Sequence, residues 1–220
     1  MPIAGEHHPA FEEYCKCIFE LAEDDMEIIQ ARMADRLQVS RPAVSEMIRR
    51  LEAEGLVTND GSIALTADGL ELAQRVVRRH RLAERFLTDV LKLSWAEAHH
   101  EAGKWEHIMS DNVESALDDL LGSPTTCPHG NPIPGHESGV GRAELQTMVE
   151  AAKNGRTATV SRISEKLQGD VEAMRQLRDA GIRPGAQVAL TIEDGDVRVD
   201  VGGTVVRLPA QDAELVYVAP

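Results

Sequence analysis

A chain of 220 residues, 42% of them hydrophobic, is long enough for one or two domains and a smaller module, which excludes a disordered polypeptide. The net charge of −14 excludes indiscriminate nucleic-acid binding, because affinity for phosphate rests on Lys and Arg. No apolar run approaches about 18 residues, and residues 1–20 lack the layout of a secretory signal, so we expect a cytoplasmic protein with no membrane segment. Three cysteines without paired spacing predict reduced thiols.

Residues 1–66 have the pattern of a DNA-binding domain. Helical spacing predicts a first helix at about 9–22 and a second that includes Ile28 to Leu37. Ser40 is a good N-cap for a third helix, which ends at Gly55. Two short apolar runs then flank the turn residues 59–62, as in a hairpin. This order predicts a winged helix-turn-helix, whose alternative is a packing or dimerisation module.

The third helix would enter the major groove of DNA with its N-terminal end. Residues at that end are candidates for contacts with bases or nearby phosphates: Ser40, Pro42, Ala43, Ser45 and Glu46. The arginines of this segment are candidates for phosphate contacts: Arg32, Arg36, Arg41, Arg49 and Arg50. Local basicity therefore permits DNA binding by an acidic chain.

Helices dominate residues 67–141, and strands dominate most of residues 142–220. A long helix capped by Thr66 is expected at about 67–92, another with a Ser94/Glu97 capping box at 95–108, and a third from Ser110 to about Leu121. A proline-rich segment, 122–141, follows. A short helix at 144–153 precedes four runs with strand alternation, at 157–163, 187–193, 197–201 and 204–208. The fold class expected is mainly α with a small β-barrel domain.

Histidines and carboxylates gather on two of the predicted helices. His80 and Glu84 are four residues apart and share a helix face, and His99 and Glu106 are seven apart with His107 beside them. Imidazole with carboxylate suits Mn(II), Fe(II), Co(II), Ni(II) or Zn(II). Each histidine alone could instead be structural. A metallo-hydrolase is the enzymatic alternative, but the chain has no H-E-x-x-H motif, so we expect no enzyme.

Several stretches resemble the family of the diphtheria toxin repressor, the iron-dependent regulators and the manganese transport regulators. They are RLQVSRPAVSEMIRRLEAEGLV (36–57), LTADG (65–69), RRHRLAERFL (78–87), HHEAGKWEHIMSD (99–111) and HGNPIPG (129–135). The resemblance implies a winged-helix domain at 1–66, a helical dimerisation and metal-binding domain at 67–141, and a linker with an SH3-like domain at 142–220. It implies a homodimer that binds double-stranded operator DNA, with one or two dimers per operator.

The resemblance also implies two metal sites. An ancillary site would use His80, Glu84 and His99, closed by a carboxylate of the C-terminal domain, which falls on Asp170 or, as a substitute, Glu172. The family's neighbouring amide ligand falls on Ala173, which cannot coordinate a metal. An anion beside this site would be bound by Arg81 and Asn131, with Cys127 in place of the usual serine.

A primary site would use Glu106 and His107 with Glu13 of the first helix. Iron sensors of the family have methionine at the Glu13 position and manganese sensors a carboxylate, which favours Mn(II) over Fe(II), with Co, Ni or Zn as substitutes. Gly103 stands where the family has a side-chain ligand, so its backbone carbonyl, a water or His100 would have to serve. Cys15 and Cys17 near Glu13 allow a thiolate ligand, although such cysteines usually pack as small hydrophobes.

These residues predict a repressor in which a metal joins the winged domain to the dimer core. The alternative is a winged-helix regulator of a small organic ligand or of redox state, with structural histidines.

Overall fold

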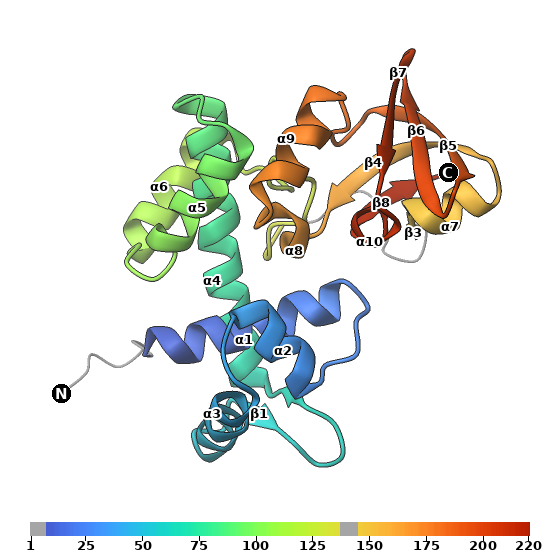
Figure 1. Ribbon diagram of the computed structural model, residues 1–220. Coiled ribbons are helices and arrows are strands. Elements are labelled where there is room, and N and C mark those ends of the chain that lie inside the picture. Colours follow the sequence, from blue (N-terminus) through green and yellow to red (C-terminus); the bar gives the residue numbers. More distant parts are fainter. Residues whose placement is uncertain (1–7, 137–144) are drawn as a thin grey trace. The chain divides into compact units, whose positions relative to one another are not determined.

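The computed structural model describes residues 8–136 and 145–220, which form two compact units. The first unit contains the described residues up to Arg79 together with Glu106–Met109, and the second contains His80–Trp105 and the described residues from Ser110 onward. Figure 1 shows the helices and strands of both units, coloured from blue at the N-terminus to red at the C-terminus. No helix in the described part of the chain has the length and apolar character that crossing a membrane requires.

The first unit is a winged helix-turn-helix. Three helices and a hairpin surround the start of a long fourth helix: α1 (Pro9–Glu23), α2 (Gln30–Leu37), α3 (Arg41–Ala53), β1 (Val57–Thr58), β2 (Ala64–Leu65) and α4 (Ala67–Arg85). Gln38 ends α2 in the left-handed conformation, and the Ser40 hydroxyl accepts a hydrogen bond from Ala43 N to begin α3. One apolar core joins these elements, with Ile18, Leu21, Met33, Ile48 and Leu51 almost fully buried.

A glycine allows the hairpin to approach α4. An added Cβ at Gly69 would lie 1.9 Å from the carbonyl oxygen of Leu56, a distance that no side chain tolerates. Thr66 caps α4 just before this contact, since its hydroxyl accepts a hydrogen bond from Gly69 N at 3.1 Å. The LTADG segment therefore fixes the start of α4 against the wing.

The second unit begins with the end of α4. A short π-helical turn, η1 (Phe86–Val90), continues α4, and two further helices follow, α5 (Trp95–Trp105) and α6 (Asp111–Leu121). The predicted capping box is present, because the Ser94 backbone and hydroxyl both contact Glu97 Oε2, at 3.0 and 2.6 Å. The described part of the proline-rich segment folds back on itself through a bridge between Thr126 and Pro132.

A six-stranded antiparallel sheet makes up most of the C-terminal part of this unit. Its order is β3-β8-β4-β5-β6-β7, formed by β3 (Gln146–Thr147), β4 (Thr157–Ile163), β5 (Gln187–Glu193), β6 (Asp196–Val201), β7 (Thr204–Leu208) and β8 (Val216–Ala219). Short helices accompany it: α7 (Met148–Lys153), α8 (Glu165–Gln168), α9 (Val171–Asp179) and α10 (Ala210–Ala213). Helices α8 and α9 pack against α5 and lie between it and the sheet (Figure 1).

The sequence pattern predicted the fold class correctly, mainly α with a small β domain. It missed α8 and α9, which begin at the N-caps Ser164 and Asp170. The helix expected at 144–153 begins at Met148, and residues 137–144, which include parts of this helix and of the proline-rich segment, lie outside the described residues. The domain boundaries at 66 and 141 stay a prediction.

Candidate metal centres

Four potential ligands converge where α4, α5 and α8 meet. Glu84 Oε1 lies 3.2 Å from His80 Nε2 and 2.9 Å from His99 Nδ1, and the two imidazole nitrogens are 3.2 Å apart. Glu165 Oε2 lies 3.8 Å from His80 Nε2 and 3.7 Å from His99 Nδ1. We call these four residues the ancillary cluster.

The separations within the ancillary cluster fit ligands of one ion. Two ligands at right angles, each about 2.1 Å from a metal, are about 3.0 Å apart, and opposite ligands are about 4.2 Å apart. The closest ligand atoms of the cluster all lie within 4.8 Å of one another. Glu165 Oε2 is buried and accepts no hydrogen bond among the described residues. An oxygen of this kind is expected where a cation belongs, so the donor set fits a divalent metal.

Glu165 corrects the expectation that Asp170 or Glu172 would close this site. Asp170 is exposed, and its carboxylate caps α9 by accepting from Glu172 N and Ala173 N. Glu172 is exposed and pairs with Arg175 at 2.5 Å. The carboxylate-x-x-amide spacing that we assigned to 170–173 occurs five residues earlier, at Glu165 and Gln168. Gln168 Oε1 is also buried and accepts no hydrogen bond from the part of the chain that the structure describes.

Arg81, which was expected to bind an anion, contacts the Glu165 carboxylate of the chain itself. Arg81 is fully buried, donates from Nε to Glu165 Oε1 at 3.0 Å, and donates from Nη1 to the carbonyl of Pro132. Asn131 donates to the carbonyl of Ile163 at 2.8 Å. The role of Arg81 with Asn131 in binding an anion stays a prediction.

Electrostatics keep both carboxylates of the cluster ionised. Burial raises the pKa of Glu84, but His129 and His80 outweigh burial and hold that pKa well below its usual range. Burial and then Glu84 raise the pKa of Glu165. Arg81, His80 and His99 lower this pKa by more, so it lies below its usual value. Ionised carboxylates are the form that a metal requires.

Glu84 also belongs to a second group of ligands, which the sequence interpretation missed. Its Oε2 lies 3.4 Å from His129 Nδ1, and Cys127 Sγ lies 3.9 Å from the same nitrogen. His129 Nε2 is buried and has no hydrogen-bond partner among the described residues, and the ring packs edge-on against Trp95 at 5.1 Å between centroids. The Cys-x-His spacing in the proline-rich segment was the available signal. Burial raises the pKa of Cys127 well above its usual range, so its thiol needs a bound cation to ionise.

The predicted primary site is formed by α1 and the residues that follow α5. His107 Nε2 lies 2.7 Å from Glu13 Oε1 and 3.4 Å from Glu106 Oε1, so the three predicted residues do come together. Glu106 is fully buried, whereas the Glu13 side chain is 42% exposed. Two carboxylates and an imidazole form a hard ligand set that suits Mn(II) or Fe(II).

Glu12 and Lys16 are two further residues of this site that the sequence interpretation missed. Glu12 Oε2 lies 2.5 Å from His107 Nδ1 and fixes the ring so that Nε2 faces the other carboxylates. Lys16 Nζ donates to both carboxylate oxygens of Glu106, at 2.9 and 2.8 Å. The spacing of Glu12, Glu13 and Lys16 along α1 was the available signal.

Other residues near the primary site are possible ligands from the sequence, namely Cys15, Cys17, Gly103 and His100. Burial raises the pKa of both Cys15 and Cys17 to about 12, and both side chains pack in the core. An added Cβ at Gly103, on α5, would meet no atom within 4 Å. His100 is exposed and lines a groove between α5 and α9.

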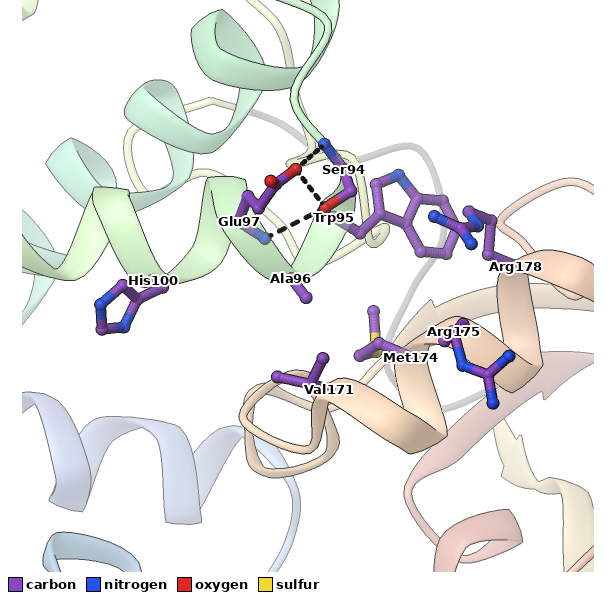
Figure 2. Close-up of a pocket in the computed structure, with 9 residues that line it drawn as sticks. All are labelled: Ser94, Trp95, Ala96, Glu97, His100, Val171, Met174, Arg175 and Arg178. Carbon is purple, nitrogen blue, oxygen red and sulfur yellow. Dashed lines mark hydrogen bonds between the residues drawn. The ribbon is translucent and has the colours of Figure 1, made fainter.

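That groove has a volume of about 590 Å³, and its lining residues belong neither to the ancillary cluster nor to the primary site. Figure 2 shows Val171 and Met174 of α9 facing the start of α5, beside Ala96 and Trp95. Its arginines are paired within α9, Arg175 with Glu172 and Asp179, and Arg178 with Asp179. This apolar packing holds α5 and α9 together next to the ancillary cluster.

The DNA-reading candidates lie mainly on an open face of α3. Most of the predicted contact residues are exposed, namely Arg32, Ser40, Arg41, Pro42, Ala43, Glu46, Arg49 and Arg50, and Ser45 is half-buried. The expected phosphate contact of Arg36 does not fit the structure, because its side chain is only 11% exposed and binds Glu20 at 2.6 Å. An arginine held in a buried ion pair is a structural residue of α2 rather than a phosphate contact.

A winged helix-turn-helix, clustered metal ligands and a C-terminal sheet domain define a metal-dependent transcription regulator. Three family models match the chain: the iron dependent repressor N-terminal DNA binding domain at residues 8–64, the iron dependent repressor metal binding and dimerisation domain at 66–135, and the FeoA domain at 148–220. The chain belongs to the family of iron-dependent repressors and the diphtheria toxin repressor.

Individual relatives are similar over most of their length. The iron-dependent repressor IdeR of Mycobacterium tuberculosis is 41% identical over 91% of this chain and 89% of its own. The diphtheria toxin repressor of Corynebacterium diphtheriae is 40% identical over 90% and 91%. Among solved structures, a manganese-dependent transcriptional repressor in complex with manganese superposes with a TM-score of 0.84 at 33% identity, covering 95% of this chain and 99% of its own. ScaR with bound Zn²⁺ gives 0.78 at 32%, covering 94% and 98%.

Proposed function

We propose that this chain is a cytoplasmic repressor, without enzymatic activity, that binds operator DNA when loaded with a divalent metal and thereby controls metal homeostasis. The observation that carries the proposal is the contact of His107 Nε2 with Glu13 and Glu106. It brings ligands from α1 of the DNA-binding unit together with ligands from the residues that directly follow α5. A metal held there restrains the winged domain through its first helix.

The metal acts in this proposal through linkage. His107, Glu13 and Glu106 hold the ion more tightly in the DNA-competent arrangement than in others, typically by about 1–3 kcal/mol in allosteric systems. DNA must then tighten metal binding by the same factor. The ancillary cluster would hold a second ion and link α8 of the C-terminal domain to α4 and α5.

Mn(II) is the first candidate for the metal and Fe(II) the second. The hard oxygens of Glu13 and Glu106 support Mn(II), as does the manganese complex among similar structures. The iron-dependent relatives support Fe(II). Co(II), Ni(II) and Zn(II) also suit imidazole with carboxylate, and Cys127 with His129 offers a softer set beside Glu84.

The proposed DNA complex has one homodimer, or two, on a pseudo-palindromic operator. Two copies of α3 would read half-sites about one helical turn apart. Base edges would be read from Ser40, Pro42, Ala43, Ser45 and Glu46, and phosphates bound by the exposed arginines.

The test measures DNA affinity as a function of metal. Duplexes are first selected from a randomised library with Mn(II)-loaded protein, and their binding is then followed by fluorescence anisotropy with Mn(II) or with EDTA. We expect EDTA to abolish specific binding and Mn(II) to restore it. Specific DNA binding that changes neither with EDTA nor with Mn(II) would contradict the metal switch and favour a regulator that responds to an organic ligand.

Matched variants assign the two sites. Glu13→Gln should abolish the Mn(II) response, and Glu165→Gln should remove one bound ion in equilibrium dialysis. Glu172→Gln is the control for the second variant, since this exposed carboxylate contacts Arg175 and not the cluster. Equal Mn(II) stoichiometry in Glu165→Gln and Glu172→Gln would reject Glu165 as a ligand.

A further inference from the structure

The primary site contains a cation that belongs to the chain itself. Lys16 Nζ lies 2.9 and 2.8 Å from the two carboxylate oxygens of Glu106. The Glu106 carboxylate is fully buried, and the Lys16 side chain is 12% exposed. Lys16 follows Glu13 by three residues on α1, so both side chains leave the same face of that helix.

This ammonium contacts both oxygens of a carboxylate that would be a metal ligand in the proposed primary site. A buried carboxylate is costly unless a cation compensates it, and a charge-assisted contact with both oxygens is a strong form of compensation. A divalent ion that binds Glu106 together with Glu13 and His107 needs at least one of the same oxygens. The ammonium and the ion then compete for the same carboxylate charge, and the positive charge of the ammonium repels the incoming ion.

We propose that Lys16 is a built-in competitor of the metal for Glu106, an inference that rests on the proposed primary site. Without metal, Lys16 neutralises Glu106 and stabilises the contact between α1 and the residues after α5. With metal, Lys16 releases Glu106 at least in part. The competition lowers metal affinity and raises the free-metal concentration at which the site fills.

Removing the charge of Lys16 should have opposite effects on Mn(II) affinity and on the melting temperature of the metal-free protein. Lys16→Met keeps the length of the side chain and removes its charge, so it should bind Mn(II) about tenfold more tightly at the primary site. It should also melt at a lower temperature in EDTA, because Glu106 loses its partner, and gain more than wild type on addition of Mn(II). Lys16→Arg is the control that retains the charge and should stay within about threefold of wild type.

The experiment titrates Mn(II) into metal-depleted full-length protein and follows free Mn(II) by electron paramagnetic resonance. A His99→Gln background weakens metal binding at the ancillary cluster, and Glu106→Gln in this background identifies the binding that belongs to the primary site. If Lys16→Met cannot be purified, Lys16→Gln serves in its place.

Tighter binding by the uncharged variant and unchanged binding by Lys16→Arg would support the competitor. If wild-type protein binds Mn(II) through Glu106 but Lys16→Met binds with equal or lower affinity, Lys16 is not a competitor, while the proposed function stands. If Mn(II) binding does not depend on Glu106 at all, the primary site and this inference fail together.

Discussion

His107 titrates between carboxylates, and its pKa makes stability depend on pH. Hydrogen bonds to Glu12 and then Glu13 raise its pKa from 6.5 to about 9. Because the folded pKa is the higher one, the stabilisation is fully present below about pH 6.5 and is lost as the pH rises through about 9. In EDTA, we expect the free energy of unfolding to fall by about 1–2 kcal/mol between these values.

Urea unfolding at pH 6.5, 7.5 and 9 measures this fall, with His107→Gln as the reference. The difference between wild type and variant isolates the imidazole from other titrating groups. A difference that stays constant across the three pH values would show that the two carboxylates do not stabilise the protonated ring.

Single residues also show where prediction from sequence stops. Helical spacing was enough to group His80 with Glu84, but it also grouped His99 with Glu106, which the structure places in two different clusters. The partners of these residues come from distant segments, and the sequence pattern did not assign α8, where Glu165 lies. Asp170 was the wrong choice because Asp at a helix start serves as an N-cap, here for α9. The spacing of Glu12 and Lys16 beside Glu13 was visible in the sequence, but only packing reveals that these residues meet Glu106 and His107.

At the scale of elements, two helical glycines make a matched pair for stability. An added Cβ would lie 1.9 Å from Leu56 O at Gly69 but would meet nothing within 4 Å at Gly103. We expect Gly69→Ala to destabilise by about 3 kcal/mol, because the wing must move away from α4. Gly103→Ala should stabilise by up to about 1 kcal/mol through helix propensity.

Chemical denaturation in EDTA compares the two variants with wild type. Equal effects of the two substitutions on the free energy of unfolding would show that the close approach of Leu56 O does not require glycine at position 69. Gly103→Glu extends the comparison, since the position has space for a side chain. Tighter Mn(II) binding by this variant would mark Gly103 as a missing ligand position of the primary site.

Elements were predicted best where local chemistry decides them. The bounds expected for β4, β5 and β7 match the structure, because alternation and flanking turns specify these strands locally. Helix α4 was expected to reach 92, but the regular helix ends at Arg85 and continues as the π-helical turn η1. Helices α8 and α9 are short and gain stability from packing on α5, which no local pattern records.

At the scale of the whole molecule, the distribution of charge separates two tasks. The chain carries a net charge of −14, but four of the five predicted phosphate-binding arginines are exposed on or beside α3. The acidic remainder of the surface therefore opposes non-specific DNA binding. We expect tight operator binding to need two copies of α3, and therefore a dimer as well as the metal.

Helix α6 carries the side chains that suit a dimer contact. Val113 and Leu120 are 49% and 65% exposed and lie seven residues apart on one face, within the segment matched by the dimerisation model. Leu120→Glu should therefore produce a monomer that keeps its fold and its Mn(II) binding at the ancillary cluster. Its affinity for the selected duplex should fall by about 100-fold or more, because the second half-site is no longer bound intramolecularly.

Ser115→Glu adds the same charge to a different face of α6 and should remain a dimer with unchanged DNA affinity. Sedimentation velocity gives the oligomeric state, and anisotropy with Mn(II) gives the affinity. If both variants stay dimeric, the exposed face of α6 is not the interface. If Leu120→Glu is monomeric and still binds the duplex as tightly as wild type, one copy of α3 is sufficient, and the two-half-site operator must be abandoned.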